Sequence, residues 1–138
     1  MEIEDEKFDS IVDDVWEHIP IHFQEKIENV GIVVESNPNK YHLGGVGRGG
    51  LLLGLFEGIP KTEPGATYFG VQPSKITLFR ENIKQTSRDL NELKITIHVV
   101  LMHEIAHYFG YNEEHLCVMD RQLKKKLLKK YHDDSGDF

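Results

Sequence analysis

The spacing of hydrophobic and polar residues predicts two helices at the start of the chain. Hydrophobic residues recur at helical intervals over residues about 7–19, which is typical of an amphipathic helix. Pro20 interrupts this pattern and suits the first turn of a second, short helix that continues through Phe23 to about Val30. Each helix then has one apolar face that must pack against another part of the protein.

The middle of the chain has the pattern of a small sheet. Three short apolar segments, GIVVE (31–35), LLLGLFEGIP (51–60) and KITLFRENI (75–83), are typical of strands. Residues 68–71 could form a fourth, brief strand. The glycine-rich segment 44–50 is followed by a strand and not by a helix, so we interpret it as a loop and not as a dinucleotide-binding turn.

A long helix is predicted after these strands. Asp89 or Asn91 could cap it, and apolar residues then surround it on all sides as far as Phe109, which is typical of a helix at the centre of a fold. Gly110 suits the position that ends such a helix, and Asn112 suits the cap of a last one. The inner face of the last helix would carry Leu116, Leu123 and Leu127. This order of elements predicts an α+β fold, with a twisted sheet of three or four strands packed on the central helix and flanked by other helices.

Length and composition limit the class of protein. The 138 residues suit a single domain, 1–138, in which we expect segments 1–6 and 133–138 to be frayed. The formal net charge of −7 argues against a nucleic-acid partner, which would need a basic surface. A single cysteine, Cys117, excludes an internal disulfide and fits a reducing compartment. The acidic start has no apolar signal region and no apolar run approaches the ~20 residues of a membrane span, so we expect a cytoplasmic protein without a membrane partner. We also expect it to be a monomer.

The segment LMHEIAHYFGYNEEHL (101–116) has the spacing of a metal site. His103 and His107 lie one helical turn apart, so both imidazoles can reach one zinc ion at ~2.0–2.1 Å. Glu104 points about 100° away and can act as a general base, as in zinc hydrolases with this H-E-x-x-H pattern. The alternative is a pair of hydrogen-bonded core histidines with Glu104 as an ion-pair partner. His98 lies five residues before His103 and so points to a different face.

A third ligand is expected just beyond Gly110, where the chain can turn sharply back towards the histidines. Glu113 stands three residues past the glycine, which is the position of the third ligand in the metzincin pattern. His115 is the more usual type of ligand, but its offset does not suit the same turn. We therefore favour Glu113 and keep His115 as the alternative.

The segments NVGIVVE, LLLGLFEGIP, ITLFRENI and HEIAHYFGYNEEHL together resemble the small bacterial zincin-like metallopeptidase family. The resemblance covers nearly the whole chain from Phe8 to Leu116. It implies a zincin-like fold in which His103 and His107 are zinc ligands, Glu104 is the base and Glu113 is the third ligand. The chain departs from the family pattern in its longer glycine-rich insert at 44–50 and in its histidine at position 115.

The function we expect is zinc-dependent hydrolysis of peptide bonds in a peptide or protein substrate. One alternative is a zincin fold without catalytic activity that binds peptides or a partner protein. A less favoured alternative is a metal-dependent endoribonuclease. A small bacterial family of such enzymes has a related histidine pattern but lacks the glutamate that stands here at Glu104.

Overall fold

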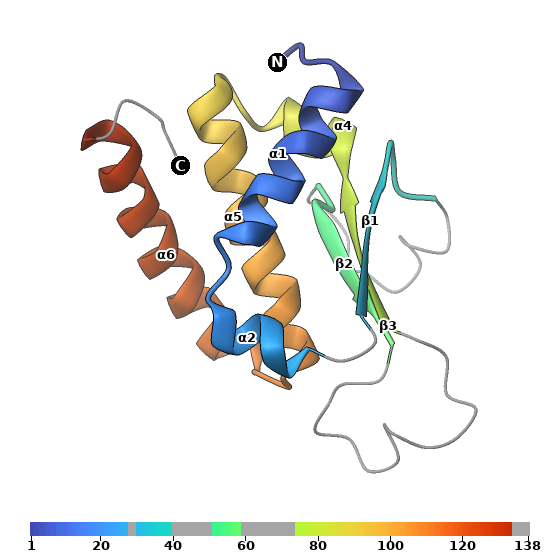
Figure 1. Cartoon of the computed structure of the whole chain (residues 1–138), viewed down its shortest axis with the longest axis vertical. Helices are drawn as coiled ribbons and strands as arrows, with labels where there is room; N and C mark the ends of the chain where they lie inside the picture. The colour runs from blue at the N-terminus through green and yellow to red at the C-terminus, as the bar shows by residue number, and fades with distance from the viewer. Residues whose placement is uncertain (28–29, 40–50, 59–73, 134–138) are drawn as a thin grey trace.

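The computed structural model describes residues 1–27, 30–39, 51–58 and 74–133. In this part of the chain the fold is α+β, as the sequence predicts, with helices gathered on one side of a three-stranded sheet (Figure 1). The helices are α1 (Asp5–Glu17), α2 (Ile21–Lys26), α4 (Arg80–Gln85), α5 (Leu90–Tyr108) and α6 (Glu113–Asp133). The strands are β1 (Val30–Glu35), β2 (Gly54–Glu57) and β3 (Ser74–Phe79). None of the helices in the described residues is both long and apolar enough to cross a membrane.

Strand β3 lies at the centre of the sheet, between β1 and β2. It runs parallel to β1, with Val30 opposite Ser74, and antiparallel to β2, with Gly54 opposite Leu78. Five of the six residues of β3 are buried, which agrees with its central place. Within the described residues β1 and β2 each have one unpaired edge, and these two edges lie on opposite sides of the sheet.

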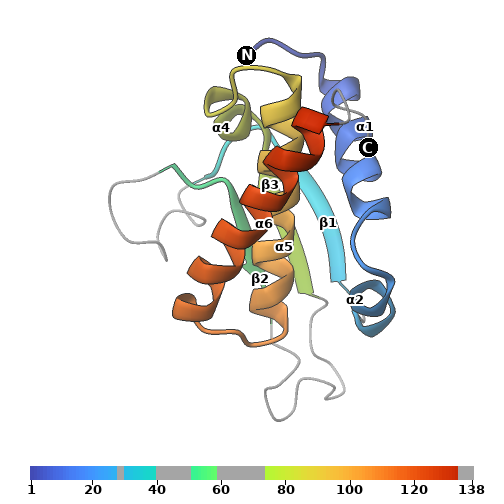
Figure 2. The ribbon, with the colours of Figure 1, turned by 90° about the vertical axis from the view of Figure 1, so that its left-hand side faces the viewer.

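Helix α5 forms the middle layer of the protein. Figure 1 shows α1 and α5 beside the sheet, and Figure 2 shows α6 packed on α5. Because α5 is covered on both sides, it can be apolar around its whole circumference, as its sequence predicts. The main core joins its side chains to those of α1 and β3, and its buried members include Phe8, Ile11, Val15, Ile76, Leu78, Leu93, Ile97 and Leu101.

Several predicted boundaries were wrong. The segment 75–83 is not one strand, because β3 ends at Phe79 and α4 begins at Arg80. Ile83 is fully buried from that helix, so one apolar pattern serves a strand and then a helical turn. The second predicted helix is shorter than expected, since α2 ends at Lys26 and Val30 already belongs to β1.

The start of the chain also differs from the expected frayed segment. Helix α1 begins at Asp5, and the ammonium group of Met1 donates hydrogen bonds to the carbonyl oxygens of Lys84 and Ser87. Met1 and Ile3 pack against the core, which accounts for this order. The glycine-rich segment 44–50, the expected fourth strand at 68–71 and residues 134–138 lie outside the described residues.

Candidate metal centre

Helix α5 begins and ends at the residues that the sequence indicates. Asp89 caps it by accepting a hydrogen bond from the Glu92 N–H at 2.9 Å. At the other end Gly110 has a φ of +82°, a left-handed conformation that favours glycine. The Tyr111 N–H then donates to the carbonyl of Ala106 at 3.1 Å, which closes the turn. The chain therefore reverses within three residues of His107 and brings the start of α6 back towards it.

The last turns of α5 bring His103, Glu104 and His107 together. The potential ligand atoms of these three side chains lie within 4.8 Å of one another, close enough to hold one metal ion. The two imidazole rings are 4.8 Å apart between centroids and lie at 65° to each other. Burial, followed by the effect of His103, lowers the pKa of His107, which favours the neutral imidazole that binds metals.

Glu104 is buried at the contact between α5 and β2. Its side chain is 7% exposed, and its Oε1 accepts a hydrogen bond from the backbone N–H of Phe56 at 2.8 Å. Burial raises the pKa of Glu104 to about 7, although His103 and the Phe56 N–H both favour the charged form. Glu113 and Asp120 add to the rise, since their negative charges disfavour a further one. A carboxyl group with this pKa can both accept and release a proton near neutral pH.

Gly54 allows β2 to approach α5 this closely. A Cβ atom at this position would lie 2.6 Å from Cγ1 of Val100 and 3.5 Å from Cγ of Glu104. A larger residue would therefore push β2 away from the helix, and with it the Phe56 N–H that holds the Glu104 carboxylate. The glycine within the strand thus has a role in positioning the site.

Of the two candidates for the third ligand, Glu113 lies beside His107 and His115 does not, while the compact group of potential ligands consists of His103, Glu104 and His107. Oε1 of Glu113 lies 3.4 Å from Nε2 of His107. Two ligand atoms that each bind a tetrahedral zinc ion at ~2.0–2.1 Å are about 3.3–3.4 Å apart, so this separation fits a shared metal. The backbone N–H of His115 donates to Oδ1 of Asn112 instead, which is the helix cap that the sequence indicates. The ring of His115 lies beside Tyr111 and does not line the pocket that contains the histidines.

Asp120 is a member of this cluster that our sequence analysis did not identify. Its Oδ2 lies 2.7 Å from Nδ1 of His103 and can accept a hydrogen bond from it. The sequence does contain a sign of this role. Asp120 lies seven residues, or about two helical turns, after Glu113, and it falls on the inner stripe formed by Leu116 and Leu123. A carboxylate on an otherwise apolar stripe needs a partner, and here that partner is His103.

These side chains line a pocket of about 620 Å³ between β2, α5 and the start of α6. Its polar members are His103, Glu104, His107, Glu113 and Asp120. The rest of the wall is mostly apolar and comes from Leu51, Leu52, Leu53, Leu55, Val99 and Val100. Tyr108 and Tyr111, on either side of the turn at Gly110, do not line this pocket. An apolar pocket with a few converging polar groups is typical of a ligand site.

Comparisons with known proteins identify the family of this chain. Residues 27–123 match the model of a family described as zincin-like metallopeptidase. No curated protein matches the chain. The solved structure of a conserved hypothetical protein from Thermus thermophilus is similar in fold, with a TM-score of 0.51 and 21% identity over 75% of this chain and 91% of that one. Because the family model spans well over half of the sequence, the chain belongs to the zincin-like metallopeptidase family.

Proposed function

We propose that this protein is a zinc-dependent peptidase that hydrolyses peptide bonds in a peptide or protein substrate. The observation that carries the proposal is the buried Glu104 carboxyl group, with a pKa of about 7, held beside two histidines on one helix face. Membership of the zincin-like metallopeptidase family supports the same class of reaction. A carboxyl group buried only for packing would not need two imidazoles and an open pocket next to it.

The metal ligands in this proposal are His103, His107 and Glu113. Two nitrogen donors and one carboxylate suit zinc, and three protein ligands leave one position open for chemistry. Asp120 would act by orienting His103. When Asp120 accepts the hydrogen bond from Nδ1, the imidazole is fixed in the tautomer whose Nε2 is free to bind a metal.

Zinc bound here would lower the pKa of a bound water towards ~7 and polarise the carbonyl of the scissile bond. Glu104 would take the proton of the attacking water and later deliver it to the leaving nitrogen. The Phe56 N–H holds Oε1, and the other carboxylate oxygen has no hydrogen-bond partner among the described residues, so it is the atom we assign to the proton transfer. The leucines of segment 51–55 would exclude bulk water from this step and contact apolar parts of the substrate.

The test combines metal content with one conservative substitution. Purified protein should contain about one zinc per chain by elemental analysis, because His103, His107 and Glu113 would together supply the three protein ligands of one zinc site. Glu104→Gln should retain this zinc but cleave an unstructured peptide library about 10²–10⁴-fold more slowly, the range that a positioned general base contributes. Glu114→Gln is the matched control, since Glu114 is exposed in the first turn of α6 and does not line the pocket.

Three outcomes would contradict the proposal. Equal cleavage by wild type and Glu104→Gln would mean that Glu104 is not the base. Zinc binding without cleavage of any peptide by the wild type would favour a zincin fold that only binds its partner. Loss of zinc from Glu104→Gln would identify Glu104 as a metal ligand and so remove the mechanism.

A further inference from the structure

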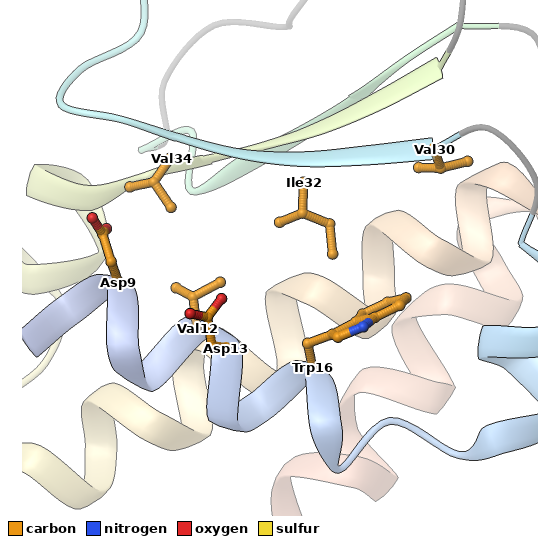
Figure 3. Close-up of a pocket in the computed structure, with 7 residues that line it drawn as sticks. All are labelled: Asp9, Val12, Asp13, Trp16, Val30, Ile32 and Val34. Atoms are coloured by element: carbon orange, nitrogen blue, oxygen red, sulfur yellow. The ribbon is translucent and has the colours of Figure 1, made fainter. Parts of the chain in front are cut away.

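A second concave surface lies between α1 and β1, at the opposite edge of the sheet from the metal centre. It is a groove of about 490 Å³, and Figure 3 shows the side chains of α1 and β1 that point into it. Its floor is apolar and consists of Val12, Trp16, Val30, Ile32 and Val34. Apart from Val12 these residues are only partly buried, so the groove leaves apolar area open to an additional partner.

The groove runs along an unpaired edge of the sheet. Strand β1 pairs with β3 on one side, and no described strand lies on its other side. A free edge presents a row of backbone N–H and C=O groups that an extended peptide can pair with. Residues 30–34 of β1 offer about 17 Å of such an edge, enough to pair with most of a segment of about six residues.

Two acidic side chains on the rim of the groove favour a positively charged partner. Asp9 and Asp13 of α1 are exposed and point into the groove, and neither has a hydrogen bond or ion pair within the described residues (Figure 3). They are four residues apart on a helix, so their carboxylates recur at about 6 Å along it. Alternate side chains of an extended strand recur at about 6.6 Å, nearly the same interval. Lysine or arginine at two alternate positions of a bound strand could therefore each meet one aspartate.

We propose that this groove binds an extended, basic segment of a partner protein, which adds to the sheet beside β1. The segment carries two basic residues two positions apart, and their alkyl stems lie over Trp16 and Val12 while their charged ends pair with Asp9 and Asp13. A second copy of this chain is a poor occupant, because the two acidic α1 helices would repel each other in a protein with a net charge of −7. The groove is independent of the metal centre, so the proposal does not depend on peptidase activity.

Trp16 provides a direct readout, because it is the only tryptophan in the chain and it lines the groove. The probe is the capped hexapeptide Thr-Lys-Val-Lys-Val-Thr, titrated against the full chain while tryptophan emission is followed. We expect a saturable shift that weakens as salt is raised. The peptides Thr-Glu-Val-Glu-Val-Thr and Thr-Lys-Lys-Val-Val-Thr, which change the charge and the spacing, should bind at least about threefold more weakly.

A pair of variants separates local recognition from general attraction by an acidic protein. Asp9→Asn with Asp13→Asn should weaken binding of the lysine peptide by about 3- to 30-fold, the range expected for two exposed ion pairs. Glu6→Gln with Asp14→Asn removes the same two charges from exposed positions of α1 outside the groove and should change binding less than about twofold. Both double variants should keep the wild-type melting temperature, since all four carboxylates are exposed.

Strand addition has its own signature in the peptide backbone. Methylation of alternate backbone nitrogens on one edge of the probe should abolish binding, whereas methylation on the other edge should not, because only one edge faces β1. Equal binding by the two methylated probes would overturn the strand-addition proposal. So would equal weakening by the two double variants, which would mean that net charge alone attracts the peptide. A dimer in light scattering that excludes the peptide would instead assign the groove to a second copy of the chain.

Discussion

Helix α5 carries three histidines, one on its buried side and two on its pocket side. The burial and the polar partners of the histidines differ between these two sides. His98 is 8% exposed, and its Nδ1 has no hydrogen-bond partner among the described residues. His103 and His107 line an open pocket, and each has a carboxylate oxygen within 3.4 Å of a ring nitrogen. Residue type and helix are the same in all three cases, so the surroundings decide which histidine can take part in chemistry.

The charges around each side of α5 explain the difference. Burial, with smaller contributions from His18 and Lys130, lowers the pKa of His98 to about 4. On the pocket side, Glu113 and Asp120 oppose the lowering of the pKa of His107. His98 is therefore a neutral core residue near pH 7. On the pocket side, the two carboxylates favour a positive charge. The comparison also shows why a histidine count alone does not identify a metal site.

The largest expected effect concerns the third ligand on the pocket side. Glu113→Ala should weaken zinc affinity by more than about 100-fold, because loss of a direct ligand exceeds the 10–100-fold typical of residues that orient ligands. His115→Ala should change the affinity less than about threefold, since its ring lies beside Tyr111 and outside the pocket. A competition titration with a chromophoric chelator measures both.

The two variants are well matched, because both residues are exposed and lie in the first turn of α6. If His115→Ala caused the greater loss, the start of α6 would have to rearrange when the metal binds. Glu113 would then be a partner of His107 at 3.4 Å and not a metal ligand.

Local signals in the sequence predicted the central helix, the residues at its ends and the spacing of the histidines in the candidate site. The cap at Asp89, the turn at Gly110 and the cap at Asn112 each depend on one residue and its near neighbours, and the structure has all three. The spacing of His103 and His107 is likewise a local property of one helix. Such features can be predicted without knowledge of how the helices pack.

The features that the sequence did not reveal depend on contacts between elements. The strand β3 and the helix α4 share one apolar pattern, and only the burial of Ile83 from a helical turn separates them. The contact of Asp120 with His103 depends on how α6 lies across α5. The donor to Glu104 is the backbone N–H of Phe56, a group present in almost every residue, so it leaves no trace in the sequence. Gly54, which makes room for the contact between Phe56 and Glu104, is the one residue in the local sequence that hints at this contact.

The next effect tests the buried side of α5 through the pH dependence of stability. A histidine with a pKa of about 4 in the folded protein and 6.5 in the unfolded chain binds its proton more readily after unfolding. The contribution of His98 to the free energy of unfolding is therefore complete above pH 6.5. It is lost as the pH falls from 6.5 to about 4, and the total loss is about 3 kcal/mol. His98→Leu should remove this loss, whereas His115→Leu should leave it unchanged.

This measurement must be made in a variant that lacks the Glu104 carboxyl group, because that group also titrates in this pH range. The pKa of Glu104 is raised from 4.5 to about 7, so in the metal-free protein its effect has the opposite sign and costs stability as the pH rises through that range. Urea unfolding between about pH 4 and pH 7.5 should therefore be compared in Glu104→Gln and in the double variant with His98→Leu. Parallel curves for the two would show that His98 is protonated or solvated in the folded state, which would break the contrast between the two sides of the helix.

The smallest of the three effects concerns Asp120, which touches a histidine without reaching the proposed metal position. Asp120→Asn should weaken zinc affinity by about 10–100-fold, because the amide is a weaker acceptor for the Nδ1–H of His103 and no longer fixes its tautomer. Nitrogen NMR of the imidazoles reports this directly: the ring of His103 should become a mixture of tautomers while that of His98 stays unchanged. Glu114→Gln, an exposed carboxylate in the first turn of the same helix, should alter neither measurement. A loss of affinity larger than that of Glu113→Ala would identify Asp120 as a metal ligand itself and not as the residue that orients His103.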